Sequence, residues 1–193
     1  MISEKEPAAL SALSPKKQLA FALLIFERML PSLIAFSKET RLDASCYFIA
    51  KEAAWSALQN KAVDPSLNAA CLEHAPDTEQ FSHELTSHAL NAALALSDIL
   101  EFTRDGNADH IAYVTTLARD SVHLYLSRLE TVVVSSPARD ARIAGHPLVQ
   151  QEQRREEEDI KLLSELPDQF DSDTVSSLRA RASTQVPLLP VND

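Results

Sequence analysis

The chain has only two glycines among 193 residues, and this scarcity limits what it can build. Average usage is about 7%, which would give roughly a dozen glycines at this length. Glycine is needed where the backbone takes a positive φ or closely approaches a phosphate, and Gly106 and Gly145 each stand alone. The sequence therefore excludes a Walker loop, a G-x-G-x-x-G dinucleotide turn and the nucleophile elbow of hydrolases. Glycine-based hairpin turns are equally scarce, so helices are the favoured secondary structure.

Composition and charge narrow the class of protein further. Hydrophobic residues make up 45% of the chain, enough for a core, and the length suits one domain. The formal net charge is −10 and no basic stripe offsets it, so we expect no nucleic-acid partner and no binding to anionic membranes. Cys46 and Cys71 lie in apolar helical runs and are expected to be buried, reduced thiols, which favours a cytoplasmic location.

An apolar run near the N-terminus shares one feature with signal peptides and lacks the others. The run from Leu19 to Phe26 follows Lys16-Lys17, but it is eight residues long and Glu27-Arg28 come directly after it. No small-residue cleavage site appears, and the run is far too short to cross a bilayer. We therefore expect neither a signal peptide nor a membrane span.

Hydrophobic periodicity, capping residues and prolines predict an all-α, single-domain bundle of about seven helices. The first helix begins at Ser14-Pro15, is buried on most sides, and ends or kinks at Pro31 with a bent continuation to Thr40. Two long helices, 78–104 and 108–133, have apolar stripes and a tight connection, which predicts an antiparallel hairpin. The other expected helices are 44–60, 65–74, 147–166 and 174–182, with a loop at 135–146 that could contain a helical turn.

The ends of the chain carry weaker patterns than its middle. We expect residues 1–13 to form a flexible lead, 14–183 the helical domain, and 184–193 a loose tail with two prolines and no period.

The expected helix 147–166 has apolar residues at its two ends and a highly charged stretch, 150–159, between them. Three pairs of opposite charge stand four residues apart, namely Arg154/Glu158, Arg155/Asp159 and Glu157/Lys161. We interpret the stretch as a solvated face held by surface ion pairs. An acidic helix that binds a partner is the alternative.

Glu27-Arg28 follows a fully apolar run directly, so at least one of the two charges should lie partly buried. A buried charge persists only with a partner, and we expect Arg28 to pair with Asp98 or Glu84 from a neighbouring helix. A structural salt bridge is the favoured interpretation. A ligand-binding carboxylate is the alternative.

His88 falls on the apolar stripe of the helix 78–104, where a core histidine is the favoured interpretation. The functional alternative joins His88 to Glu84 and Asn91 as a polar strip, which Asp98 extends by one step. The candidate residues for a ligand-binding pocket are therefore Glu27, Arg28, Glu84, His88, Asn91 and Asp98.

Metal-site patterns are incomplete. Zinc proteases need histidines at i and i+4, whereas His83 and His88 are five apart, about 140° around a helix. Asp120 and His123 have the i,i+3 spacing of di-iron bundles, but no second such pair exists, and we expect an exposed ion-pair cluster beside Arg119. A metal site formed by three histidines that meet across helices stays open as an alternative. We predict no metal, no cofactor and no catalytic residue.

Several short segments of the sequence indicate one family. They are Leu13-Ser-Pro-Lys-Lys-Gln-Leu-Ala-Phe-Ala22, Glu27-Arg-Met-Leu-Pro31, Trp55-Ser-Ala-Leu58, Ala93-Leu-Ala-Leu-Ser-Asp98 and His146-Pro-Leu-Val-Gln-Gln-Glu152. Over residues 13–182 the chain resembles the YjaG-like family, a bacterial group with a domain of unknown function. The resemblance implies an all-helical, soluble bacterial protein and no particular reaction. Asn91 stands where relatives are expected to have an acidic residue, which weakens a metal site on that helix.

Together these patterns favour a non-enzymatic helical protein that acts through a protein partner or through self-association. The reasons are the missing reactive constellation, the missing cofactor loop, and a surface rich in charge and alanine; a homodimer would fit. The alternative is an enzyme, or a ligand or metal binder, with a polar pocket inside the bundle lined by the six candidate residues.

Overall fold

A computed structural model describes residues 9–129 and 137–190, and within them every regular element is a helix. The helices are α2 (Pro15–Thr40), α3 (Ser45–Ala57), α4 (Ser66–Glu73), α5 (Thr86–Asp105), α6 (Ala108–Leu129), α7 (Pro137–Ala144), α8 (Pro147–Glu165) and α9 (Ser172–Thr184). The predicted all-α class is confirmed. The predicted number of helices was too low.

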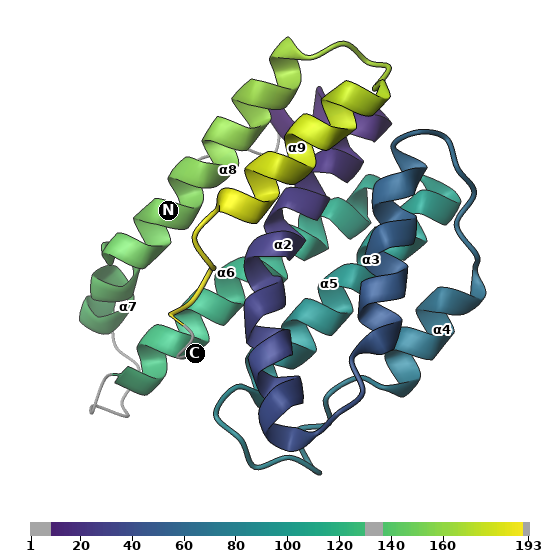
Figure 1. Ribbon diagram of the computed structural model, residues 1–193. Coiled ribbons are helices and arrows are strands. Elements are labelled where there is room, and N and C mark those ends of the chain that lie inside the picture. Colours follow the sequence, from purple (N-terminus) through teal and green to yellow (C-terminus); the bar gives the residue numbers. More distant parts are fainter. Residues whose placement is uncertain (1–8, 130–136, 191–193) are drawn as a thin grey trace.

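Helix α2 is the centre of the molecule. It contacts α3, α5, α6, α8 and α9, and Figure 1 shows it running between these neighbours. Every residue from Leu19 to Phe26 is buried, as the apolar run predicted. Pro31 lies inside the helix and does not end it, because buried Leu33 and Phe36 anchor the next turns in the core.

The apolar run alone was predicted to be too short to cross a membrane. The whole of α2, judged by length and composition alone, is long and apolar enough to cross one. In the fold, 78% of its most apolar stretch is buried against the other helices. A helix that is apolar on most sides and buried among other helices is typical of a protein core.

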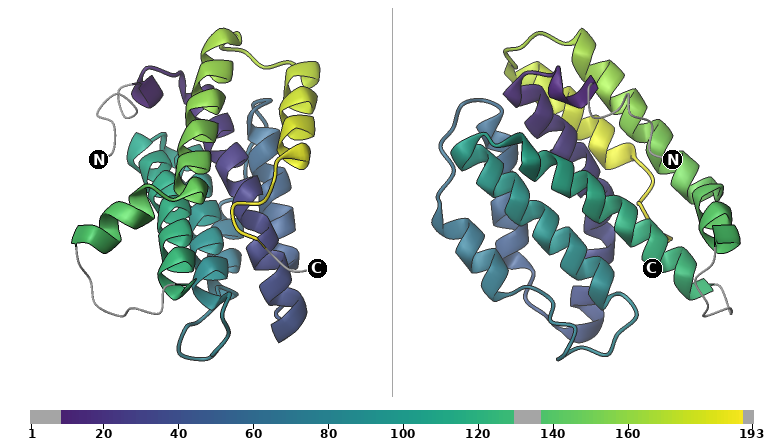
Figure 2. Two further views of the ribbon diagram at one scale, coloured as in Figure 1. Left: turned by 90° about the vertical axis from the view of Figure 1, so that its left-hand side faces the viewer. Right: turned by 180° about the vertical axis from the view of Figure 1, so that it is seen from behind.

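Helices α5 and α6 form the predicted antiparallel hairpin and lie side by side behind α2 (Figure 2). Gly106 makes the turn in the left-handed region, at φ 68°, and its N–H donates to the Phe102 carbonyl at 2.9 Å. The hairpin is shorter than predicted at its start. Residues 78–85 form turns, and the Thr86 hydroxyl bonds the carbonyls of Phe81 and His83 before α5 begins.

Helix α7 lies in the segment predicted as a loop, and it accounts for part of the difference in helix number. Pro137 suits the first turn of a helix, and Ile143 is buried against the rest of the molecule. Gly145 follows directly, so the helix is only two turns long. The part of the expected loop at 135–136, and the expected helix end at 130–133, lie outside the described residues.

Both ends of the described chain pack more firmly than predicted. In the lead, residues 9–11 are helical, Leu13 is buried, and the Gln18 amide donates to the Leu13 carbonyl at 3.1 Å. In the tail, Leu188 and Leu189 are buried, and the Leu188 N–H donates to the Arg28 carbonyl at 2.8 Å. The two leucines between the tail prolines are apolar, which explains this packing. Because the tail has no helical period, the sequence did not indicate that these leucines would be buried.

Candidate functional site

Arg28 lies in the middle of α2 and is 1% exposed. Its Nε and Nη2 both donate to Oε1 of Glu152, at 3.0 and 2.7 Å. Its Nη1 donates to Oδ2 of Asp159 at 2.7 Å and to Oε1 of Gln185 at 3.0 Å. Arg28 is therefore buried and paired, as predicted, but its partners come from α8 and the tail. The prediction that Glu84 or Asp98 would pair with Arg28 was wrong.

The carboxylates that face Arg28 come from the charged stretch of α8. Val149, Glu152, Glu156, Asp159 and Leu163 are the buried residues of this helix. They follow one another at steps of three and four, so they form a single inner stripe. The prediction of a solvated face was thus wrong for three carboxylates, because the charged positions continue the apolar stripe instead of lying opposite to it.

Three more arginines complete a buried ion-pair network around α8. Arg181 of α9 binds Oδ1 of Asp159 through Nε and Nη2, at 3.0 and 2.8 Å, and Arg119 of α6 binds both oxygens of Glu156. Arg155 is the looser member, with its Nη1 3.7 Å from Oε2 of Glu152. We call these seven residues the α8 ion network: Arg28, Arg119, Glu152, Arg155, Glu156, Asp159 and Arg181.

The α8 ion network links α8 to α2, α6 and α9. Burial lowers the pKa of Arg155, although Glu152 opposes this, so the charge of Arg155 is less well compensated than that of Arg28. Burial likewise opposes the charge on Arg28, but Glu152 and Asp159 outweigh it and raise the pKa of Arg28. Oε2 of Glu152 is buried and accepts no hydrogen bond from the described residues.

The other sequence candidates do not gather at one place. Glu27 accepts a hydrogen bond from the Trp55 indole at 2.9 Å and pairs with Lys51. Asn91 donates to the Ser121 hydroxyl at 3.0 Å, on the contact between α5 and α6. Glu84 is exposed, ahead of α5. The helical period had joined Glu84 to His88, Asn91 and Asp98, but Glu84 lies before the first residue of α5.

His88 is 3% exposed and its Nδ1 has no hydrogen-bond partner within the described chain. Burial lowers the pKa of His88, Arg128 adds to this effect, and Glu84 opposes it. His88 is therefore a core histidine that favours the neutral form. His83 precedes α5 and bonds Glu39 at 2.7 Å, which places it outside any motif shared with His88.

Asp98 binds His110 across the α5–α6 turn, with the Asp98 carboxylate 2.8 Å from Nδ1. Glu101, Asp105 and His110 offer ligand atoms within 4.8 Å of one another, which is metal-site spacing. Arg104 already binds Glu101 and lies 3.7 Å from Asp105, so an internal cation neutralises this cluster. The arrangement is a surface ion-pair cluster that closes the hairpin.

A pocket of about 220 Å³, lined by polar side chains together with Ala144 and Val149, opens between α6 and α8, next to the α8 ion network. Arg119, Asp120 and His123 line its α6 side, and Glu152 and Gln153 line its α8 side. Asp120 and His123 are exposed, as predicted. That Glu152 lies beside them could not be predicted from the sequence, because this contact depends on how two helices pack.

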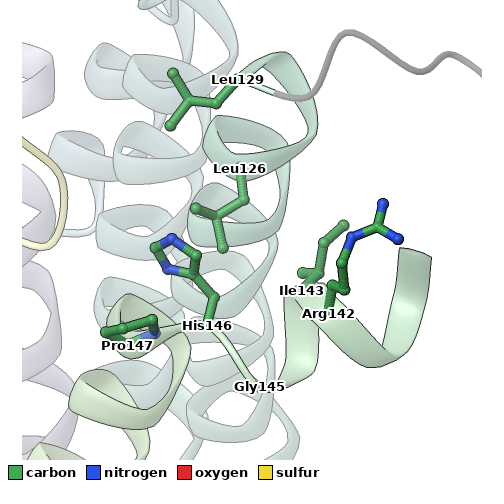
Figure 3. A pocket seen from close by; sticks show the side chains of 7 residues that line it. All are labelled: Leu126, Leu129, Arg142, Ile143, Gly145, His146 and Pro147. Carbon is green, nitrogen blue, oxygen red and sulfur yellow. The ribbon is translucent and has the colours of Figure 1, made fainter. Parts of the chain in front are cut away.

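A second pocket, of about 490 Å³, lies where α6, α7 and α8 meet, and Figure 3 shows its lining. Leu126, Leu129 and Ile143 supply apolar surface, while Arg142 and His146 add polar groups at its edges. Nδ1 of His146 caps α8 by accepting from the Leu148 N–H at 3.2 Å. Among the described residues that line this pocket, no two side chains form a nucleophile–base pair.

The fold and the α8 ion network define an all-helical protein whose interior charges are bound to one another. A family model described as "Protein of unknown function (DUF416)" matches residues 7–186, and the chain belongs to that family. The finer YjaG-like assignment stays a prediction. No curated protein matches the chain.

The fold has a close counterpart among solved structures. The crystal structure of a DUF416 family protein from Shewanella baltica OS155 is 20% identical, with a TM-score of 0.85. The match covers 94% of this chain and 95% of that chain. At this identity the likeness shows that the two chains share a fold.

Proposed function

We propose that this protein acts without catalysis, by self-association through the outer face of α3 and α4. The observation that carries the proposal is a group of large apolar side chains left in solvent. Phe48 and Ile49 on α3 are 41% and 58% exposed, and Leu72 on α4 is 43% exposed. We call these three residues the α3–α4 face.

The two helices that carry these residues are fixed against each other. The Tyr47 hydroxyl donates to the carbonyls of Cys71 and His74, at 3.1 and 2.8 Å, which fixes α3 against α4. Exposed apolar groups on adjoining elements often mark association sites. A second copy presents the same side chains, so a two-fold pairing covers both sets at once. The acidic chain, with its reduced thiols, would do this in the cytoplasm.

Sedimentation velocity over a range of concentrations tests the proposal. We expect the wild type to shift from monomer to dimer as concentration rises, and Ile49→Glu to remain monomeric because a carboxylate cannot be buried in an apolar interface. Val186→Glu is the matched control, since Val186 is 61% exposed but lies on the tail. A wild type that stays monomeric, or an equal effect of both variants, would contradict the proposal.

The pocket between α6 and α8 supports a second candidate, the binding of a small amine. Its lining includes the exposed carboxylate of Asp120 and the buried carboxylate of Glu152, whose Oε2 accepts no hydrogen bond from the described residues. The arginine in the pocket, Arg119, is already bound to Glu156. A cationic donor therefore suits the site, and the net charge of −10 would attract it.

Calorimetric titration with 1,4-diaminobutane tests this candidate. Binding should be weakened at least tenfold in Asp120→Asn and unchanged in Asp173→Asn, an exposed carboxylate on α9. Absence of binding to the wild type, or equal loss in both variants, would remove the candidate.

A further inference from the structure

The two cysteines of the chain meet at the contact between α3 and α4. Cys46 lies in the first turn of α3 and is half-buried, while Cys71 lies near the end of α4 and is 1% exposed. Both are free thiols, and they lie close enough for each to influence the ionisation of the other. The sequence placed each thiol on an apolar helix without indicating that they face each other.

Tyr47 fixes this arrangement from the neighbouring position. Its hydroxyl donates to the carbonyl of Cys71 itself at 3.1 Å, and the ring is fully buried. The residue after Cys46 is thus bonded to the backbone of Cys71, so the two helices cannot slide apart without breaking a buried hydrogen bond. The thiols are held together by the fold.

We propose that Cys46 and Cys71 form a reversible oxidation site, in which a hydroperoxide converts the two thiols into a disulfide between α3 and α4. Cys46 is the residue that meets the oxidant, because part of its side chain is accessible. Cys71 is the resolving residue, because it is covered from solvent and lies near Cys46.

The chemistry has two steps. The Cys46 thiolate attacks one peroxide oxygen, the O–O bond breaks, and Cys46 becomes a sulfenic acid while the other oxygen leaves as water or an alcohol. The Cys71 sulfur then attacks the Cys46 sulfur, an S–S bond forms, and the hydroxyl leaves as water with the proton from Cys71. Two thiols and one hydrogen peroxide thus give one disulfide and two waters. A dithiol reductant reverses the change.

The surroundings of the two thiols determine which one ionises first and how fast the pair is oxidised. Burial raises the pKa of Cys46, and Asp43 adds to this, whereas hydrogen bonds from the Cys71 thiol and the Tyr47 N–H act in the opposite direction. Burial raises the pKa of Cys71 further, to about 12, and the charge of an ionised Cys46 contributes. Cys46 therefore ionises first. Because both pKa values are raised, the pair reacts slowly at neutral pH and faster as pH rises.

Intact-mass spectrometry after treatment with hydrogen peroxide tests the proposal on the wild-type protein. We expect a species that has lost two hydrogen atoms, that migrates as a monomer without reductant, and that regains both thiols with dithiothreitol. The rate should increase by roughly tenfold per pH unit below the pKa of Cys46. The bridged form should melt roughly 5–10 °C higher than the reduced form, because the bridge closes a loop of about 25 residues.

Two variants separate the roles of the thiols. Cys71→Ala should stop at an oxygen adduct on Cys46, and Cys46→Ser should leave Cys71 unmodified. Accumulation of sulfinic acid in the wild type, a bridge between two chains, or equal oxidation of Cys71 in Cys46→Ser would overturn the proposal. The test is independent of self-association, because it is read from the mass of a single chain.

Discussion

Arg28 has hydrogen bonds from all three of its guanidinium nitrogens, to two carboxylates and one amide. The first helix supplies the arginine, and partners more than a hundred positions away supply the oxygens. Taking such charges out of water is costly, and the cost is offset only while each partner remains in place. Arg28 is therefore a structural residue whose loss leaves Glu152 and Asp159 buried without their main cation.

Arg28→Met should lower the free energy of unfolding by about 3–5 kcal/mol, the cost of breaking a buried ion pair from one side. Urea denaturation followed by circular dichroism measures this change. Arg154→Met is the matched control, because Arg154 lies on the exposed side of α8. Its effect should stay within about 0.5 kcal/mol. Equal effects of the two substitutions would show that Arg28 is not buried among carboxylates.

At the scale of elements, the α5–α6 hairpin is closed by His110, which lies between Asp98 and Asp105. Burial opposes the charge on His110, but its bonds to the two carboxylates outweigh this and raise its pKa above the ordinary value of 6.5. A raised pKa means that the folded protein holds the proton more tightly. The resulting stability is present in full below pH 6.5 and is lost as pH rises through the folded pKa.

His110→Gln should therefore destabilise the protein more at pH 6 than at pH 8. Urea unfolding of both proteins at the two pH values gives the comparison, and an NMR titration of the His110 ring gives its pKa directly. Asp98→Asn removes the nearer partner and should bring that pKa down. A destabilisation that is constant from pH 6 to pH 8 would contradict the assigned ion pair.

The tail after α9 is the element that differs most from its predicted character. Leu189 is 2% exposed, so Leu189→Ala should cost about 2–3 kcal/mol of unfolding free energy through lost packing. Val186→Ala, three positions earlier on the same segment, removes an exposed side chain and should cost less than about 0.5 kcal/mol. Thermal or urea unfolding distinguishes the two. Similar small effects would mean that the tail does not pack on the core.

Helix α8 shows why part of the site could not be predicted. Its helical period was readable, and Val149 and Leu163 identified the inner face. Glu152, Glu156 and Asp159 fall on the same stripe, but a charge is normally placed in solvent unless a partner is known. The partner of Glu152 and Asp159 is Arg28, 124 and 131 positions away, and the partner of Glu156 is Arg119, 37 positions away. The sequence thus indicated that Arg28 needs a buried partner, but it did not indicate which residues would be that partner.

At the scale of the whole molecule, local rules were sufficient for the main architecture. The lack of glycine, the apolar run of α2 and the stripes of α5 and α6 predicted an all-helical bundle with a central helix and a hairpin. The pocket between α6 and α8 and the thiol pair between α3 and α4 arise only from packing. Both therefore became visible with the structure, as did the exposed α3–α4 face on which the proposed function rests.

Native mass spectrometry on protein purified without chelators tests the central claim most directly, because one spectrum reports both subunit number and retained small molecules. We predict a dimer of bare chains that becomes a monomer in Ile49→Glu. A monomer that carries an extra mass, and loses it in Asp120→Asn, would contradict self-association and make the pocket between α6 and α8 the functional site.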